Sequence, residues 1–135
     1  MRTYLTIAII ILSAAAVIFC QTAIAADPVK DAKEAYAQFV KAAKAQKTDE
    51  AKNLLAKDAL SDLEKDNAVD FFIAMHADIT PETIKAAKAE VKGSMVVLKI
   101  EQVEKTKEGS FSTNATVYMI KEDGQWKVGK PAGAK

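Results

Sequence analysis

Cysteine, histidine and arginine are almost absent from this chain of 135 residues, in which Cys20, His76 and Arg2 are each the only residue of their type. Structural disulfides, thiolate metal sites, iron–sulfur clusters and covalently attached haem all need more cysteine than this. If Cys20 is removed with a leader, as argued below, a cysteine nucleophile is excluded as well. The sequence therefore predicts a domain that is stabilised by packing alone.

An excess of positive charge is also lacking. The chain has 19 basic and 18 acidic residues, and all the acids and all the lysines lie after residue 26. Proteins that bind nucleic acids usually show a basic excess and use arginine for bidentate contacts. The composition therefore argues against a nucleic-acid partner and favours a solvated surface of mixed charge.

The longest apolar stretch is at the start of the chain. Arg2 precedes an apolar run (4–19), and the small residues Ala23 and Ala25 follow before the first acid. A basic start, an apolar segment and two small residues with one residue between them are typical of a secretory signal peptide cut after Ala25. We therefore expect a periplasmic or extracellular protein whose single domain spans residues 26–135, with membrane contact only through the leader.

Two other interpretations of this leader remain open. Cleavage before Cys20 would give a lipoprotein, although the bulky Phe19 is a poor match for the small residue expected there. An uncleaved anchor is the third interpretation, but an apolar run of about sixteen residues is shorter than the roughly twenty that a spanning helix needs. No later segment of the sequence is apolar enough to span a membrane.

The rest of the chain changes its hydrophobic period near Pro81. Before this residue, apolar side chains recur at three- and four-residue steps, whereas after it Val, Ile and Thr alternate with polar residues. Helices followed by strands predict an α+β domain, with N-terminal helices on a curved antiparallel sheet of about four strands. Such a sheet would form an open cone, and its interior would be the natural ligand pocket.

Three helices are expected in the first half. Asp27 and Pro28 are typical of a helix start, and Thr48 can cap a short second helix. A third is expected from Asp58 or from Ser61, which begins a capping box, and it would continue to Met75. The expected buried side chains are Val29, Ala32, Tyr36, Phe39, Val40 and Ala43 on the first helix and Leu60, Leu63, Ala68, Phe71, Phe72 and Met75 on the third.

Strands are expected over 95–104, 111–122 and 125–130, with a weaker candidate over 83–92 whose alanines would also suit a helix. Asp123-Gly124 predicts a tight hairpin turn, since glycine readily adopts the positive φ that such turns need. Together these segments make a meander of antiparallel strands.

The order of these elements resembles the nuclear-transport-factor-2-like superfamily, which has a cystatin-like α+β fold. The resemblance rests on an exported leader, a first helix carrying Tyr36, a helical pair, and a terminal hairpin that reads Lys-Glu-Asp-Gly-Gln-Trp-Lys-Val over 121–128. More narrowly, the chain is similar to small exported bacterial proteins of unknown function within that fold. Because this superfamily includes isomerases, dehydratases, ligand binders and interaction modules, the resemblance implies a fold and several possible functions.

His76 is the one candidate for acid–base chemistry. Enzymes of the resembled superfamily move a proton with an acid or an Asp/His pair inside the cone, and Asp70 and Asp78 lie near His76 in the sequence. A spacing of six residues, however, does not bring Asp70 and His76 to one helix face. His76 also lies at the expected end of a helix, where a partly exposed imidazole is ordinary.

The favoured hypothesis is a non-enzymatic domain that binds a small apolar ligand or a protein partner, without cofactor or metal. The candidate pocket residues are Tyr36, Phe72, His76 and Tyr118, although Tyr36 is more simply explained as core. The two alternatives are a small isomerase or hydratase using His76, and an accessory protein that forms a homodimer. Such a dimer would use an exposed sheet face made by Thr113, Ala115, Val117 and Met119.

Overall fold

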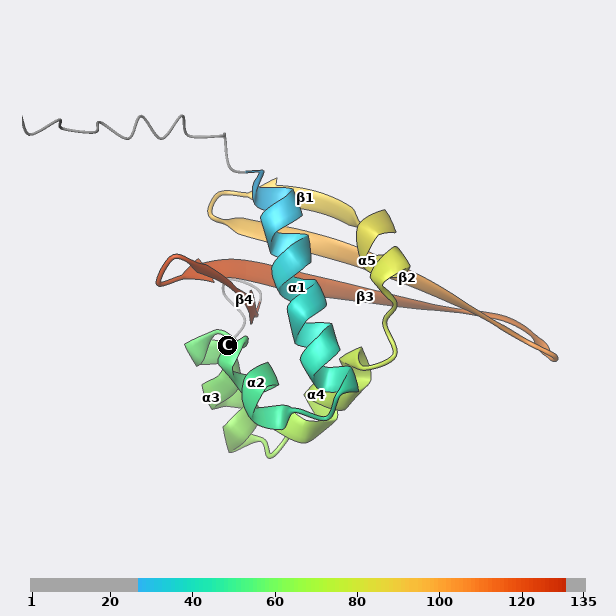
Figure 1. Cartoon of the computed structure of the whole chain (residues 1–135), viewed down its shortest axis with the longest axis horizontal. Helices are drawn as coiled ribbons and strands as arrows, with labels where there is room; N and C mark the ends of the chain where they lie inside the picture. Colours follow the sequence, from blue (N-terminus) through green and yellow to red (C-terminus); the bar gives the residue numbers. More distant parts are fainter. Residues whose placement is uncertain (1–26, 131–135) are drawn as a thin grey trace, which may run out of the picture.

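The computed structural model describes residues 27–130, in which helices precede strands as the change of period predicts (Figure 1). The helices in this range are α1 (Pro28–Lys44), α2 (Thr48–Asn53), α3 (Lys57–Lys65), α4 (Val69–His76) and α5 (Pro81–Ala86). The strands are β1 (Lys88–Lys92), β2 (Met95–Thr106), β3 (Gly109–Glu122) and β4 (Gln125–Gly129). They pair in sequence order as an open antiparallel sheet, so the predicted α+β class is confirmed.

The predicted signal peptide, with Cys20 and Ala25, lies outside the described residues, as does the tail after residue 130. Within residues 27–130, no helix combines the length and the apolar character that a membrane crossing requires.

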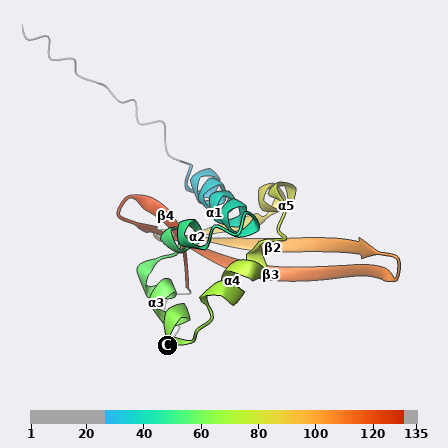
Figure 2. The same cartoon turned by 60° about the horizontal axis from the view of Figure 1, so that its bottom comes forward.

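Helix α1 begins where the sequence predicts. The Asp27 carboxylate accepts hydrogen bonds from the backbone amides of Val29 and Lys30, at 3.1 and 3.2 Å, and Pro28 occupies the first helical position. Figures 1 and 2 show α1 running across the sheet, with α2 and α4 near its C-terminal end and the β2–β3 hairpin reaching beyond the helices. One side of α1 is therefore buried against the strands.

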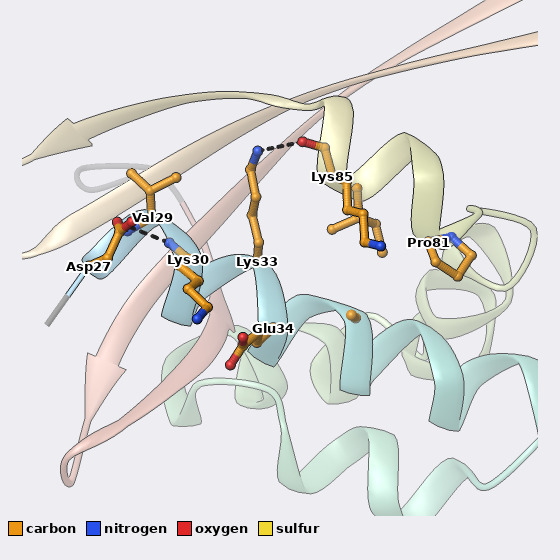
Figure 3. Close-up of a pocket in the computed structure, with 9 residues that line it drawn as sticks. Asp27, Val29, Lys30, Lys33, Glu34, Pro81 and Lys85 are labelled. Atoms are coloured by element: carbon orange, nitrogen blue, oxygen red, sulfur yellow. Dashed lines mark hydrogen bonds between the residues drawn. The ribbon is translucent and has the colours of Figure 1, made fainter.

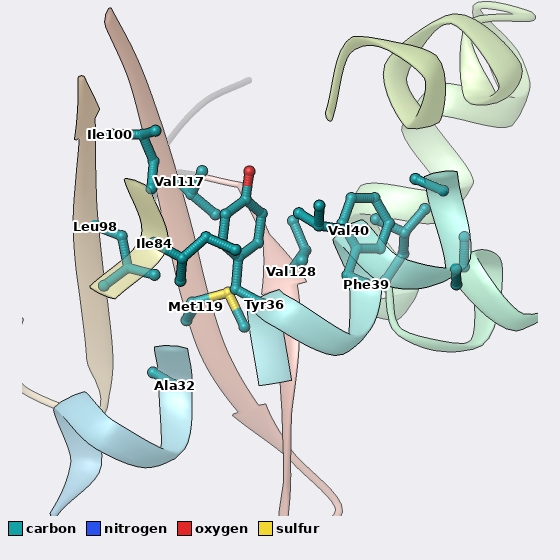
Figure 4. Packing of buried hydrophobic residues seen from close by; sticks show 14 of the residues in the cluster. Ala32, Tyr36, Phe39, Val40, Ile84, Leu98, Ile100, Val117, Met119 and Val128 are labelled. Carbon is teal, nitrogen blue, oxygen red and sulfur yellow. The ribbon is translucent and has the colours of Figure 1, made fainter. Parts of the chain in front are cut away.

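The space between α1 and the sheet is filled by side chains. Tyr36 of α1, Leu98 of β2 and Met119 of β3 lie there, and all three are fully buried (Figure 4). Phe39 of α1 is also fully buried, and its ring packs against those of Phe72 and His76 of α4. The predicted alternation of β2 is confirmed, since Val96, Leu98 and Ile100 all point into this cluster. The interior of the expected cone is thus core, and any cavity must lie at its margin.

The β3–β4 hairpin turns at Asp123 and Gly124, as predicted. Their φ angles are 51° and 77°, and two consecutive positive φ values are the signature of the tight turn that matches the twist of paired strands. The free edge of β4 is covered by the connection between α2 and α3. The amide of Val128 donates to the carbonyl of Leu54, and the amide of Ala56 donates to the carbonyl of Val128, both at 2.8 Å.

The third predicted helix is wrong in two respects, because it is two helices and its capping box does not form. Asn67 has a left-handed backbone, with φ of 51°, between α3 and α4, and such a residue ends a helix. Ser61 lies inside α3, whose N-cap is Ala56. The predicted cap at Thr48 is also absent, since α2 has Lys47 as its N-cap and no side-chain cap hydrogen bond.

The break at Asn67 also changes which side of α4 is buried. Phe71 and Met75, predicted to be core, are 69% and 59% exposed, whereas Ile73 and His76 are buried. Because α4 starts anew at Val69, the direction of its side chains is not set by α3. Extending the apolar spacing of α3 into α4 therefore predicts the wrong buried face.

The segment after Pro81 is a helix before it is a strand. The hydroxyl oxygen of Thr80 accepts from the amide of Thr83 at 3.2 Å, which caps α5 with Pro81 in its first turn. Strand β1 starts only at Lys88, so the weak strand predicted from Thr83 is correct in its second half alone.

The surface predicted for dimer formation is largely core. Val117 and Met119 point toward the helices and are buried, because these strand positions pair with Leu98 and Val96, which α1 covers. The open face of the sheet carries the intervening residues of β3, such as Thr116.

The outer half of the β2–β3 hairpin is a two-stranded arm. β1 pairs with β2 only as far as Lys99, and β4 pairs with β3 only from Tyr118 onward. The residues of β2 after Lys99 and of β3 before Tyr118 therefore pair only with each other. The base of this arm, beside the end of α4, is where the candidate site lies.

Candidate functional site

His76 is buried at the last residue of α4. Its exposed fraction is 7%, so the expectation of a partly exposed imidazole at this helix end is wrong. The reason is the new phase of α4, which turns this position toward the core. Buried polar groups are normally hydrogen-bonded, so the partners of the two ring nitrogens of His76 must be identified.

A short hydrogen bond joins His76 to Tyr36 of α1. The Tyr36 Oη atom lies 2.6 Å from His76 Nδ1, and the imidazole packs against two phenylalanine rings. The centroid of Phe72 lies 4.7 Å and that of Phe39 lies 5.4 Å from the imidazole centroid. This aromatic cluster fixes the ring plane and positions one ring nitrogen at the tyrosine hydroxyl.

Burial keeps both members of this pair neutral. Desolvation lowers the pKa of His76 to about 4, and it raises the pKa of Tyr36 above its usual value, because charged forms are disfavoured away from water. Within the described residues the Tyr36 hydroxyl has no other hydrogen-bond partner. We therefore assign Tyr36 as the donor, Nδ1 as the acceptor and the imidazole proton to Nε2, since the other tautomer would leave the tyrosine O–H without an acceptor.

A cavity of about 240 Å³ lies beside His76. It is enclosed by the end of α4, the α4–α5 connection and the helix-facing side of the β2–β3 arm. Its lining residues are Met75, His76, Asp78, Ile79, Ile100, Gln102, Glu104, Thr113, Asn114 and Ala115. Since the Nδ1 edge of His76 is turned to Tyr36, the Nε2 edge is the one left to face this cavity.

Gln102 supplies a second fixed polar group. Its amide nitrogen donates to the backbone carbonyl of Asp78 at 3.1 Å and to the Glu104 carboxylate at 3.4 Å. These two acceptors determine which end of the amide is nitrogen. The opposite atom, Oε1, is buried and has no hydrogen-bond partner among the described residues.

Of the four predicted pocket residues, the structure brings three together. Tyr36, Phe72 and His76 form the aromatic cluster, but only His76 lines the cavity. Tyr118 lies apart, because its register pairs it with Val97 on the sheet face turned away from α1. Tyr36 and Phe72 therefore contact His76 but do not line the cavity themselves.

Of the two acids that lie near His76 in the sequence, only Asp78 lines the cavity. Asp70 is exposed in the first turn of α4 and is not part of the lining.

Gln102 and Glu104 line the cavity but were not predicted from the sequence. The signal for them was present, because they continue the inward alternation of Ile100 with polar side chains where apolar ones are expected.

A larger groove of about 480 Å³ lies between the start of α1 and α5 (Figure 3). The Lys33 ammonium bridges these helices by donating to the carbonyl of Lys85 at 2.9 Å. The charged side chains that line this groove are exposed or half-buried. It therefore lacks the fixed, buried polar groups that distinguish the cavity beside His76.

Within residues 27–130, no three histidine, cysteine or acidic side chains are grouped to hold a metal ion. The chain matches no protein-family model and no curated protein. The similarity to nuclear-transport-factor-2-like proteins therefore stays a prediction, and the function is argued from the geometry of the site.

Proposed function

We propose that this protein is a binding domain that holds a small ligand in the cavity between α4 and the β2–β3 arm, without acid–base catalysis. One observation carries the proposal. The neutral His76 is fixed by Tyr36 at Nδ1 and is left with an Nε2–H donor at a cavity. A donor held in a fixed orientation at a cavity contributes recognition, because its direction favours a ligand that places an acceptor there.

The same pair argues against the catalytic alternative. A general base works best when its pKa lies near the working pH, whereas burial holds the pKa of His76 near 4. At neutral pH this imidazole is too weak a base to take a proton readily and carries no extra proton to give. The predicted partner Asp70 is exposed to solvent and is not in the cavity lining.

The lining favours a ligand of mixed character over the purely apolar one expected from sequence. Met75, Ile79 and Ile100 offer apolar contact, while Gln102 and Glu104 are polar. Ligand sites are commonly built in this way, from apolar walls with a few placed polar groups. With the predicted leader, we propose that binding takes place in the periplasm or outside the cell.

Filling the cavity from the arm is expected to weaken ligand binding. Thr113 is exposed on β3 and lines the cavity, so Thr113→Trp should weaken any ligand found there by about tenfold or more. The measurement is a fragment screen by NMR, followed through the signals of the single imidazole.

Ser112→Trp is the matched control for this variant. Ser112 is the neighbouring exposed residue of β3 and points to the opposite face of the arm. It should leave ligand binding unchanged. A screen in which no compound perturbs the imidazole, or in which both tryptophan variants bind equally well, would contradict the proposed function.

A further inference from the structure

We infer that the free edge of β3 in the β2–β3 arm pairs with the same edge of a second copy of this chain, as an antiparallel two-fold dimer. This interface is separate from the cavity beside His76, and it uses the edge of the sheet, not the face expected from sequence. Three observations carry it: unpaired backbone groups on β3, protection of the other sheet edges, and the side chains of β3.

The backbone groups of alternate β3 residues point away from β2. In β4, the amide and the carbonyl of Val128 both bond to the α2–α3 connection, so Lys127 and Gly129 direct their backbone groups to β3. Their partners Ile120 and Tyr118 therefore face β4. Because this direction alternates along an antiparallel strand, the even-numbered residues before Tyr118 face the same way, where β4 no longer pairs. They are Ser110, Ser112, Asn114 and Thr116.

These four residues leave a row of amides and carbonyls without a strand beside them. All four are exposed, and within residues 27–130 no other strand or backbone group pairs with their outward side. This part of β3 reaches beyond the helices (Figure 1). Such a row is a template to which another extended chain can add as a strand.

The other edges of the sheet carry features that oppose strand addition. The edge of β4 is covered by the α2–α3 connection. Charged side chains, which discourage edge pairing, occur on β1 and on the outer part of β2. They are Lys88, Glu90 and Lys92 on β1, and Glu101, Glu104 and Lys105 on β2.

Strand β3 has none of these protective features along its free edge. Residues 109–120 include no charged side chain and no proline. The register with β2 continues without a bulge from Gly109 to Ile120. An edge that is exposed, regular and uncharged is the kind that pairs with another strand.

A second copy of β3 suits this edge because the strand is uncharged. A two-fold axis places residues near it opposite themselves or a close neighbour, so any charge there would meet a like charge. An axis at Thr113 brings the outward-facing residues opposite one another. Ser112 then pairs with Asn114, and Ser110 pairs with Thr116, so all four unpaired residues of each copy gain backbone partners.

The same axis covers an exposed aromatic ring. Phe111 is 59% exposed, and strand alternation places it on the same side of β3 as the buried Val117. In the dimer Phe111 lies opposite Ala115 of the second copy, at a position where side chains approach closely. A large ring beside a small side chain adds apolar burial to the backbone hydrogen bonds.

Pairing is expected to stop at the dimer. The two-fold contact uses the free edge of β3 in both copies, and the charged outer edge of β2 does not pair in turn. An interface made by one strand from each copy is small. We therefore expect a reversible dimer with a Kd of about 10–100 μM.

Sedimentation equilibrium of the protein recovered after expression of the full chain measures this association. Ser112→Pro removes one outward amide from β3 and should weaken the dimer by about tenfold or more, because proline cannot donate. Val103→Pro is the matched control. Val103 is the β2 partner of Ser112, so its amide also faces away from the arm, on the other edge. This variant should leave the dimer unchanged.

Amide hydrogen exchange at low and high protein concentration locates the interface without a substitution. The amides of the four outward-facing β3 residues should exchange about tenfold more slowly in the dimer, whereas that of Val103 should not change. A protein that stays monomeric at about 1 mM would overturn the proposal. So would a dimer that both proline variants weaken equally, or one that leaves the exchange of these β3 amides unchanged.

Discussion

Replacing Phe39 by alanine is expected to lower the free energy of unfolding by about 3–5 kcal/mol, the usual cost of removing a buried aromatic ring. Phe39 is fully buried, and its ring centroid lies 5.4 Å from His76 and 6.2 Å from Phe72. The rest of the cluster cannot close over the missing ring without moving α1 or α4. The truncation therefore leaves a cavity in addition to the lost transfer free energy.

Phe71→Ala is the matched control, since it removes the same side chain from α4. Phe71 is 69% exposed, so its loss should change stability by no more than about 0.5 kcal/mol. Urea unfolding followed by the fluorescence of the single Trp126 measures both variants. Equal losses for Phe39→Ala and Phe71→Ala would contradict the orientation of α4 and, with it, the burial of His76.

Stability should also fall steeply as the pH drops from about 6.5 to about 4. Burial lowers the pKa of His76 from its ordinary 6.5 to about 4 in the folded state. In this interval the unfolded chain takes up a proton that the folded protein does not, so protonation favours unfolding. The full contribution, on the order of 3 kcal/mol, is present above pH 6.5 and is lost as the pH falls to 4.

His76→Phe isolates this contribution from the carboxylates, which titrate in both proteins. The wild type minus variant difference in unfolding free energy should rise by about 3 kcal/mol between pH 4 and pH 6.5. Urea unfolding at a series of pH values gives this difference. Parallel profiles for the two proteins would mean that His76 titrates equally in the folded and unfolded chains.

The parts of the fold that followed from sequence are those with a strong local signal. Asp27 and Pro28 determine the start of α1, and Asp123-Gly124 determines the last turn, because each acts on its own neighbours. The break at Asn67 was missed, since asparagine adopts a left-handed backbone only in some contexts. That one residue altered the buried face of the whole of α4.

The site could be predicted only in part, for a related reason. Tyr36 and His76 are separated by 40 positions, and helical spacing rules describe partners only three or four residues apart. The alternation of β3 separates Tyr118 from Met119 correctly, but it does not say which face the helices cover. The cavity itself depends on how α4 meets the β2–β3 arm, which is a tertiary property.

The state of the His76 imidazole tests the central claim most directly, and a chain with one histidine makes the measurement unambiguous. Nitrogen-15 NMR of the labelled protein should show, at pH 7, a neutral ring protonated at Nε2, with a titration midpoint near pH 4. Tyr36→Phe, which removes the donor to Nδ1, should give a mixture of tautomers. A wild-type midpoint near 6.5 with mixed tautomers would contradict the account, because the imidazole would then be neither buried nor fixed at the cavity.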